Sequence, residues 1–419
     1  MIDIKILREN PDKVKKACAD KRADIDIDKI LELDKKRRQA LQEVEGLKAE
    51  KNKLGKEDAE KGKQIKERIK ALEPELEQVE TELNDLFSQI PNLPMDDVPV
   101  GRDENDNKVL RTWGDIPKFD FKPKDHIELG KTLDIIDTET AGKISGTRFG
   151  YLKGDAALME FALVRFVFDV LGSEKTLKKI ADGVEKGYSS KPFVPVVPPV
   201  MIKPEAYKRM ARLSEQDKNE RYYLQQDDMY LIGSAEHTLG PIHMDEIIDE
   251  KDLPKRYIAF SSCFRREAGS YGKDTQGILR VHQFDKLEME SFTTPENSIK
   301  EQNFIVGIQE YLMKKLELPH RLMMICTGDM GKPDARQIDV ETWMPGQNKY
   351  RETHTSDLNT DYQSRRLNTR VKRKNGQIEF VHMNDATAFA VGRMIVAIVE
   401  NFQKKDGTIK IPKILKKYL

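Results

Sequence analysis

The sequence of 419 residues is short of cysteine, has no net charge and has no long apolar run. Its three cysteines (Cys18, Cys263 and Cys326) lie far apart, and an odd number cannot all pair internally, so we expect free thiols in the reducing cytoplasm. Basic and acidic residues number 72 each, which excludes a uniformly basic nucleic-acid-binding chain but not a local basic surface. No segment approaches about 18 uninterrupted apolar residues, so no membrane span is expected.

Several common catalytic motifs are also missing. The chain has no GxGxxG after a strand, no HExxH, no CxxC and no GxSxG. Its Gly-Lys-Thr run at 130–132 lacks the earlier glycine of a phosphate-binding loop, because Asp125 stands at that position. We therefore exclude a P-loop, a dinucleotide fold of the usual type and a serine hydrolase, and we expect no zinc site.

Proline and glycine are rare in residues 28–90, where apolar residues follow a heptad pattern. In the second half of this segment the spacing alternates between four and three residues, as in a coiled-coil seam: Ile65, Ile69, Leu72, Leu76, Val79, Leu83, Leu86 and Ile90. The first half is less regular, and the segment KLGKEDAEKGK between the halves contains Gly55 and Gly62 as helix stops. We predict an antiparallel coiled-coil helical hairpin that projects into solvent.

The charge of this hairpin is uneven. Residues 35–70 hold 13 basic and 7 acidic side chains, a net charge of +6, whereas residues 71–90 hold 6 acidic and no basic ones. A solvated coiled-coil surface explains this pattern. A polyanion-binding arm explains it as well, because clustered lysine and arginine bind phosphates by releasing counterions.

The composition changes after the hairpin. Residues 91–112 are rich in Pro, Gly, Asn and Asp and are predicted to be a linker, so we divide the chain into domains 1–112 and 113–419. The second domain mixes an apolar helix at 155–171 and a helical tail at 388–402 with alternating, strand-like segments. No βαβ repeat is present, which indicates an α+β fold with a mostly antiparallel sheet.

A strand–loop–strand hairpin is predicted from CFRREAGSYGKD (263–274) and GILRVHQFDKLEM (277–289). Arg265 and Glu267 share a face if they lie on a strand. The Arg265 guanidinium can pair with a phosphate, Glu267 can accept from an exocyclic amine, and Phe284 can stack on a flat base. These residues alone fit a surface hairpin with an ordinary salt bridge equally well.

The FRRE segment and its loop resemble motif 2 of class II aminoacyl-tRNA synthetases, and the chain as a whole resembles the seryl-tRNA synthetase family. The segments that carry the resemblance, in order, are FVPVVPPVM (motif 1), YLIGSAEHTLGPIHMDEII, the motif 2 hairpin, ICTGDMG, DVETWMPGQNKYRE with DYQSRR, and FVHMNDATAFAVGRMIVAIVENFQ (motif 3). The hairpin at 28–90 resembles the long helical arm of the same family. The resemblance implies a class II synthetase-type antiparallel sheet flanked by helices.

It further implies a two-step reaction in a cytoplasmic homodimer joined through motif 1. L-serine and ATP form seryl-adenylate with Mg²⁺, and the seryl group then passes to the 3′ end of tRNA(Ser), with tRNA(Sec) as a further candidate acceptor. The N-terminal domain is expected to bind the tRNA through its arm, and residues 113–419 are expected to form the class II catalytic domain.

The resemblance assigns ATP-binding residues position by position. Arg265 and Arg393 are the catalytic candidates, on the α- and γ-phosphates respectively. Glu352 and Thr355 match the positions that contact Mg²⁺ and ATP. The remaining ATP-binding candidates are Glu267 and Phe284 at the adenine, with Arg266, Val281, Thr353 and His354.

Serine is small and polar, so its site must hydrogen-bond both the ammonium and the hydroxyl group. The resemblance assigns this task to Glu236, Glu288 and Thr387, with Ser234 and Ala235 completing the Ser-Ala-Glu segment. Such a site rejects alanine strongly, because alanine would leave buried polar groups without partners.

The sequence departs from the family pattern near the substrate. Ser234 replaces a usual threonine, ETHTSDLN (352–359) replaces a serine- and cysteine-rich stretch, and NDATA (384–388) replaces Asn-Gly-Ser-Gly. One branch of the family binds zinc, but it needs a cysteine near motif 3, and this chain has none there. The basic run at 365–374 fits either a solvated face or an RNA contact.

Two alternatives to a seryl-tRNA synthetase are open to the same sequence. Relatives that charge carrier proteins lack the helical arm, whereas this chain has it. A non-catalytic RNA-binding paralogue is expected to lose arginines of the ATP site or glutamates of the serine site, whereas Arg265, Arg393, Glu236 and Glu288 are all present.

Overall fold

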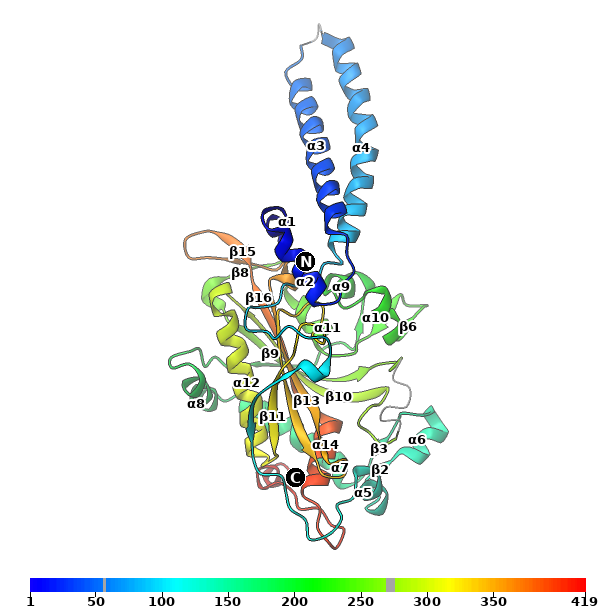
Figure 1. Ribbon diagram of the computed structural model, residues 1–419, viewed down its shortest axis with the longest axis vertical. Helices are drawn as coiled ribbons and strands as arrows, with labels where there is room; N and C mark the ends of the chain where they lie inside the picture. Colours follow the sequence, from blue (N-terminus) through cyan, green and yellow to red (C-terminus); the bar gives the residue numbers. More distant parts are fainter. Residues whose placement is uncertain (56–57, 269–275) are drawn as a thin grey trace. The chain divides into compact units, whose positions relative to one another are not determined.

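The computed structural model describes residues 1–55, 58–268 and 276–419 and divides into two compact units, Met1–Leu93 and Pro94–Leu419 (Figure 1). Parts of the predicted turn at 55–62 and of the motif 2 loop lie outside the described residues. Within the described ranges, no helix is both long enough and apolar enough to span a membrane.

Unit 1 is helical. Its helices are α1 (Ile4–Glu9), α2 (Pro11–Asp20), α3 (Ile27–Lys51) and α4 (Ala59–Phe87). Helices α3 and α4 lie side by side (Figure 1), and their ion pairs run in opposite directions along the chain: Lys29 meets Glu82, and Arg68 meets Glu43. The predicted antiparallel hairpin is therefore confirmed.

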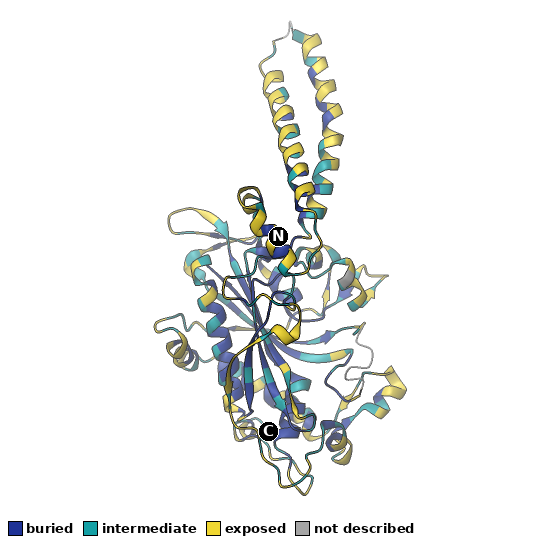
Figure 2. Cartoon of the chain, in the orientation of Figure 1, coloured by how far each residue is buried: buried dark blue, intermediate teal, exposed yellow. Residues whose placement is uncertain are grey.

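The heptad positions hold this hairpin together. Ile65, Ile69, Leu72 and Leu83 of α4 are buried, whereas the outer faces of both helices are exposed (Figure 2). The cross-helix ion pairs are solvent-exposed, and exposed pairs of this kind add little to stability. Burial of the seam, rather than these pairs, is the main source of stability in the hairpin.

Unit 2 is built on an eight-stranded sheet. In spatial order its strands are β1 (Lys108–Trp113), β11 (His320–Met324), β12 (Arg336–Met344), β13 (Lys349–Thr360), β16 (His382–Ala390), β10 (Gln283–Thr293), β9 (Lys255–Phe264) and β4 (Val194–Val196). Only the β4–β9 pair is parallel among these neighbours in the described chain. The predicted α+β class with a mostly antiparallel sheet is confirmed.

Three helices pack on this sheet and supply the main core: α7 (Asp155–Leu171), α12 (Ser298–Lys315) and α14 (Val391–Asn401). Helix α7 matches its prediction. Helix α14 begins three residues later than the tail predicted at 388–402, because residues 388–390 stay in the β16 ladder opposite β10.

Smaller elements surround the sheet. The further helices are α5 (His126–Thr132), α6 (Thr138–Ser145), α8 (Glu174–Val184), α9 (Pro204–Arg209), α10 (Glu215–Glu220), α11 (Glu236–Leu239) and α13 (Tyr362–Leu367). The small sheets contain β2 (Ile136–Asp137) with β3 (Tyr151–Leu152); β5 (Met201–Ile202), β7 (Met229–Leu231) and β6 (Tyr223–Leu224); and β15 (Ile378–Phe380), β14 (Arg370–Lys372) and β8 (Ile247–Asp249). Short 3₁₀ turns occur at Glu104–Asp106, Gly240–His243, Glu250–Asp252, Pro295–Asn297 and Lys413–Lys417.

The segment expected to be a linker, residues 91–112, is mostly part of unit 2. The Met95 amide donates to the Ala335 carbonyl oxygen, the Thr327 amide donates to that of Pro99, and β1 pairs with β11. These backbone hydrogen bonds place the boundary between the compact units at residues 93 and 94 rather than at residue 112.

The basic run at 365–374 is largely engaged within unit 2. Arg365 pairs with Asp361 at 2.8 Å, and Arg373 pairs with Glu296 at 2.7 Å. Arg365 also lies over the ring of Phe380, at 4.7 Å from its centroid. These contacts favour a structural role for the two arginines over an RNA contact.

A fully buried ion pair joins β9 to α12. Arg256 donates from Nε and Nη2 to the two carboxylate oxygens of Glu301, each at 2.7 Å, and its Nη1 donates to the Lys191 carbonyl oxygen. Arg256→Met would leave the Glu301 charge buried without its partner, so we expect the free energy of unfolding of unit 2 to fall by about 3–5 kcal/mol. Denaturant unfolding followed by near-ultraviolet circular dichroism measures this loss.

The surface pair Arg165–Asp169 provides the control, since Arg165 is exposed, Asp169 is half-buried and the two groups lie 3.0 Å apart. We expect Arg165→Met to cost less than about 1 kcal/mol. The double variant Arg256→Met/Glu301→Leu should recover most of the lost stability, because it removes both buried charges. Equal losses in the two single variants would contradict this account of the buried pair.

Candidate active site

Two adjoining pockets open in unit 2. The first has a volume of about 240 Å³ and the second about 310 Å³, and they share Arg265, Glu267, Lys286 and Thr355. The first is also lined by Ile278, Leu279, Arg280, Val281, Phe284, Glu352, Thr353, Thr387, Ala390, Gly392 and Arg393. The second is also lined by Arg212, Glu220, Arg221, Ser234, Glu236, His237, Asp357 and Asp385. Most of the predicted site residues are thus brought together, although they come from distant parts of the chain.

One end of the first pocket is strongly charged. Arg393, in the first turn of α14, donates from Nη1 to Glu352 Oε1 at 3.1 Å and to the Glu352 carbonyl oxygen at 2.9 Å. The Glu352 side chain is about half exposed, and although desolvation at the pocket acts to raise the pKa of its carboxyl, the nearby Arg393 and Arg265 guanidinium groups hold this pKa below its usual value. Glu352 is therefore ionised at neutral pH, and Arg393 is fixed at the rim of the pocket.

The first pocket also contains an aromatic ring, Phe284, beside charged groups. The Arg265 guanidinium lies over the Phe284 ring, 5.3 Å from its centroid, and its Nε donates to the Gly233 carbonyl oxygen at 3.0 Å. Glu267 accepts from Arg280 Nη1 at 2.9 Å. The pocket therefore offers a planar cation beside an aromatic face, with Val281 as an apolar wall.

The predicted strand around Arg265 needs correction. Strand β9 ends at Phe264, and Glu267 has a left-handed backbone with φ of 53°. Strand β10 begins at Gln283 rather than at residue 277. Arg265 and Glu267 therefore share a pocket because the chain turns after β9, and the alternation of a strand does not apply to them.

The second pocket is rich in carboxylates, and Glu288 lies directly behind its wall. Ser234 Oγ donates to Glu288 Oε2 at 3.0 Å and accepts from Lys286 Nζ at 3.2 Å, while Lys286 also forms an ion pair with Glu288. Burial raises the pKa of the Glu288 carboxyl despite this pairing. Thr387 lies opposite Glu288 in the β10–β16 ladder. These groups can hydrogen-bond a small polar molecule from several sides.

Besides Glu288, three predicted residues do not line either pocket in the described structure. Ala235 is fully buried in an apolar cluster with Leu239. His354 is also fully buried, with Nδ1 2.8 Å from Thr353 Oγ1 and its ring packed on Phe389. Successive side chains of a strand point to opposite faces, so a strand that turns Thr355 into the pocket turns His354 away from it.

Arg266 is the third of these residues. Its Nε donates to the Arg221 carbonyl oxygen at 2.9 Å, and its guanidinium lies over the Tyr222 ring, 4.9 Å from the centroid. It therefore packs beside the site rather than facing the space that Arg265 enters.

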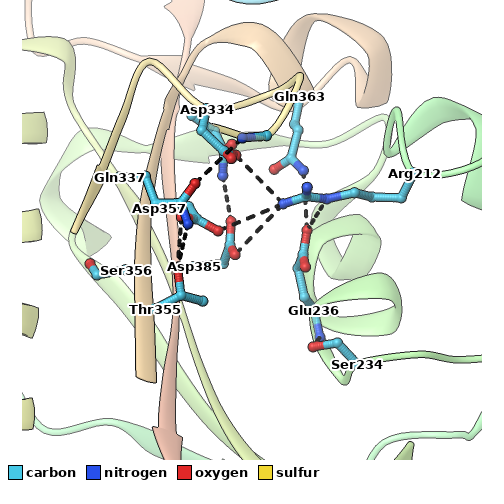
Figure 3. A network of polar contacts seen from close by, with 12 residues as sticks. Arg212, Ser234, Glu236, Asp334, Gln337, Thr355, Ser356, Asp357, Gln363 and Asp385 are labelled. Carbon is cyan, nitrogen blue, oxygen red and sulfur yellow. Dashed lines mark hydrogen bonds and ion pairs between the residues drawn. The ribbon is translucent and has the colours of Figure 1, made fainter. Parts of the chain in front are cut away.

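The structure adds residues that the sequence analysis missed. Arg212, which follows α9, enters the second pocket among four carboxylates, one of them from Glu236 (Figure 3). Asp357 and Asp385 lie in the two segments that depart from the family pattern. These departures are the feature of the sequence that could have pointed to the two residues. Lys286 stands two residues before Glu288 on the same strand, so strand alternation would have found it.

The described residues contain no group of three or more His, Cys, Asp or Glu side chains arranged to hold a metal ion. Glu352 and Thr355 nevertheless offer oxygen donors on one strand and in one pocket. Mg²⁺ is usually held by one or two carboxylates together with substrate phosphates, so this donor set suits Mg²⁺ that arrives with a nucleotide.

Comparison with known proteins shows the same division of the chain. Residues 1–94 match the family model of the seryl-tRNA synthetase N-terminal domain, and residues 220–402 match that of the tRNA synthetase class II core domain (G, H, P, S and T). Serine--tRNA ligases of Dictyoglomus turgidum and Nitrosopumilus maritimus are 41% and 39% identical, and each alignment covers 100% of this chain and 98% or 99% of the relative.

Solved structures agree with these relatives. The seryl-tRNA synthetase of Pyrococcus horikoshii, complexed with ATP, has a TM-score of 0.89 and 37% identity over 100% of this chain and 98% of its own. The cytoplasmic serine-tRNA ligase of Naegleria fowleri, in complex with AMP, has a TM-score of 0.88 and 32% identity over 100% of this chain and 97% of its own.

Proposed function

The chain belongs to the seryl-tRNA synthetase family, and from this premise we propose that it is an ATP-dependent serine--tRNA ligase. The observation that carries the proposal is the pair of adjoining pockets that share Arg265. One pocket suits a nucleotide and the other a small, polar amino acid, so a carboxylate in the second can reach a phosphate in the first.

The first step joins the two substrates. An oxygen of the serine carboxylate forms a bond to the α-phosphorus of ATP, and the bond from that phosphorus to the pyrophosphate oxygen breaks. Such a transfer depends on positioning and on stabilising negative charge, and it needs no covalent nucleophile from the protein. We assign the α-phosphate to Arg265, the γ-phosphate to Arg393, and the adenine to the face of Phe284 beside Glu267.

Glu352 and Thr355 are the residues that we assign to Mg²⁺ bound with ATP, which would neutralise part of the phosphate charge. Glu352 is ionised and already held by Arg393, which supports this assignment. In the second step the terminal ribose hydroxyl of tRNA attacks the seryl carbonyl carbon, and AMP leaves.

We place serine in the second pocket, close to its boundary with the first. We assign the ammonium to Glu236, and the hydroxyl to the Ser234–Glu288–Lys286 cluster and to Thr387, which lines the adjoining first pocket. All of these groups except Lys286 are hydroxyls or carboxyls, and all are buried. Alanine would leave several of them without a partner, which supports discrimination in favour of serine.

The two compact units support a division of labour. We assign tRNA(Ser) binding to the hairpin α3–α4, and within it to residues 35–70, whose net charge of +6 suits a phosphate backbone. A homodimer is supported by apolar side chains that are exposed on α7 and around β4, among them Leu158, Phe161, Val194 and Val197. A cytoplasmic location fits the three cysteines, all of which are buried and free.

The function is tested by ATP–pyrophosphate exchange without tRNA, with each of the twenty amino acids supplied separately. We expect exchange with serine alone, since the second pocket demands a short side chain with a hydrogen-bonding group. Exchange with a different amino acid would mean that Asp357 and Asp385 have changed the specificity of the pocket. Absence of exchange with every amino acid would favour a non-catalytic paralogue.

A further inference from the structure

Arg212 reaches the second pocket from an unusual turn. It follows helix α9, and the residue before it, Ala211, has a left-handed backbone with φ of 59°. This conformation is disfavoured for a residue with a Cβ atom, and unfavourable backbone of this kind occurs most often at functional sites. The turn directs the Arg212 side chain inward, where only 17% of it is exposed.

The guanidinium of Arg212 is the centre of an acidic cluster (Figure 3). Its Nε donates to Glu236 Oε1 at 2.6 Å, and its Nη2 lies 3.7 Å from Asp334, 3.9 Å from Asp385 and 4.0 Å from Asp357. The four carboxylates come from α11, from the segment before β12, from β13 and from β16. Arg212 therefore ties together four segments that are far apart in the sequence.

The acids in this region outnumber the cations. Burial, followed by the charge of Glu236, raises the pKa of the Asp385 carboxyl well above its usual range. Glu290, opposite Asp385 in the β10–β16 ladder, is fully buried, and both of its carboxylate oxygens lack a hydrogen-bond partner within the described part of the chain. Arg212 is thus a permanent cation held among four carboxylates.

The same contact fixes the direction of Glu236. A carboxylate is planar, so a hydrogen bond from Arg212 Nε to Oε1 also sets where Oε2 points. Gln363 Nε2 contacts Oε1 as well, at 3.5 Å. The group that we assign to the serine ammonium is therefore oriented by Arg212.

We propose that Arg212 is a positioning and specificity residue of the amino-acid pocket: it orients Glu236 and fills the acidic end of the pocket with its own cation, so that only a small, uncharged side chain fits. This inference rests on the proposed function. It adds a prediction about substrate class, because the pocket without Arg212 should accept a cationic side chain.

The first test is chemical rescue. Arg212→Ala should raise the KM for serine in ATP–pyrophosphate exchange by about 100-fold, the effect of losing a charge-assisted hydrogen bond, while the KM for ATP changes by less than about threefold. Guanidinium chloride at millimolar, non-denaturing concentrations should then lower the KM for serine, because the free ion can occupy the vacated space. Sodium chloride at equal ionic strength should not.

Arg209→Ala is the matched control. Arg209 belongs to the same segment and pairs with Asp245 at 2.8 Å, outside either pocket. Its loss should leave the KM for serine unchanged, and guanidinium should have no effect on it. Should Arg212→Ala fail to fold, Arg212→Lys keeps a cation without the planar fork, and we expect an increase of about tenfold in the KM for serine.

The second test concerns specificity. Arg212→Ala should gain exchange with L-diaminobutyrate, which is one methylene longer than serine and ends in an ammonium group. It should gain much less with homoserine, which has the same length and ends in a hydroxyl. Adding Asp385→Asn should reduce the gain with L-diaminobutyrate, because an amide, unlike the carboxyl group, cannot ionise to pair with the bound ammonium.

The outcomes separate this proposal from the proposed function. If the wild-type chain shows no serine-dependent exchange, the proposed function fails. If the wild-type chain is active and a folded Arg212→Ala or Arg212→Lys variant keeps the wild-type KM for serine, the Arg212 proposal is wrong. Loss of activity in Arg212→Ala without rescue by guanidinium, and without any gain for L-diaminobutyrate, would also overturn it.

Discussion

Replacing Arg265 by alanine is expected to reduce kcat/KM for serine-dependent ATP–pyrophosphate exchange by about 10³-fold. Arg265 is the cation that both pockets share, and its position is fixed by the Gly233 carbonyl oxygen and by the Phe284 ring. In the proposed function it thus stands where the serine carboxylate and the α-phosphate meet. Its removal would leave charge that develops between them without a preorganised donor.

The neighbouring Arg266 provides a control for this prediction. Family resemblance assigns both arginines to ATP, whereas the structure turns Arg266 toward Tyr222 and the Arg221 carbonyl oxygen. We expect Arg266→Ala to lose no more than about tenfold in kcat/KM for exchange, far less than Arg265→Ala. Equal losses would show that Arg266 enters the site when ATP binds, contrary to the geometry described above.

The hairpin of unit 1 was predictable because its information is local. A heptad repeat specifies both the helices and the buried seam, and residues such as Ile65 and Leu83 occupy the positions that the spacing assigns to them. The end of the N-terminal unit was harder to place. Residues 94–112 look like a linker in composition, but they are held by backbone hydrogen bonds to strands that lie more than 200 residues later.

The site was predictable only in part, because the direction of its side chains is set by the fold and not by a local sequence pattern. The resemblance to a family predicts Arg265, Glu288 and Arg393 as site residues, and the structure brings Arg265 and Arg393 to one pocket, with Glu288 in the adjoining cluster. It also included His354, which strand alternation turns into the core. A motif identifies a stretch of sequence, whereas the direction of each side chain depends on local backbone.

The acidic cluster around Arg212 could not be derived from the sequence. Its carboxylates come from four segments between Glu236 and Asp385, and no spacing rule relates these positions. Arg212 itself stands in a short turn with no recognisable motif. Departures such as Asp357 indicated that the pocket differs from the family pattern, but only the fold shows that they share one cation.

Shortening the hairpin is expected to separate the two half-reactions. Glu43 and Arg68 face each other across α3 and α4 at 2.9 Å, so residues 44–67 can be replaced by a short glycine-rich turn that leaves the base of the hairpin paired. We expect serine-dependent exchange to stay within about twofold of the wild-type rate, because the residues of both pockets belong to unit 2. Aminoacylation of tRNA(Ser) should fall by at least about 100-fold, because the arm would no longer contact the tRNA backbone.

A charge variant of full length distinguishes the two interpretations of the basic part of the hairpin, residues 35–70. Replacing Lys51, Lys53, Lys63 and Lys66 by glutamine removes four positive charges and keeps the length of both helices. If the arm binds phosphates, the KM for tRNA should rise and its dependence on log salt should become shallower, by up to about one unit for each phosphate that a lysine no longer neutralises. A solvated coiled-coil surface predicts no change in either quantity.

Equal loss of exchange and of aminoacylation in the shortened variant would contradict the division of labour, because it would mean that adenylate formation also depends on the hairpin.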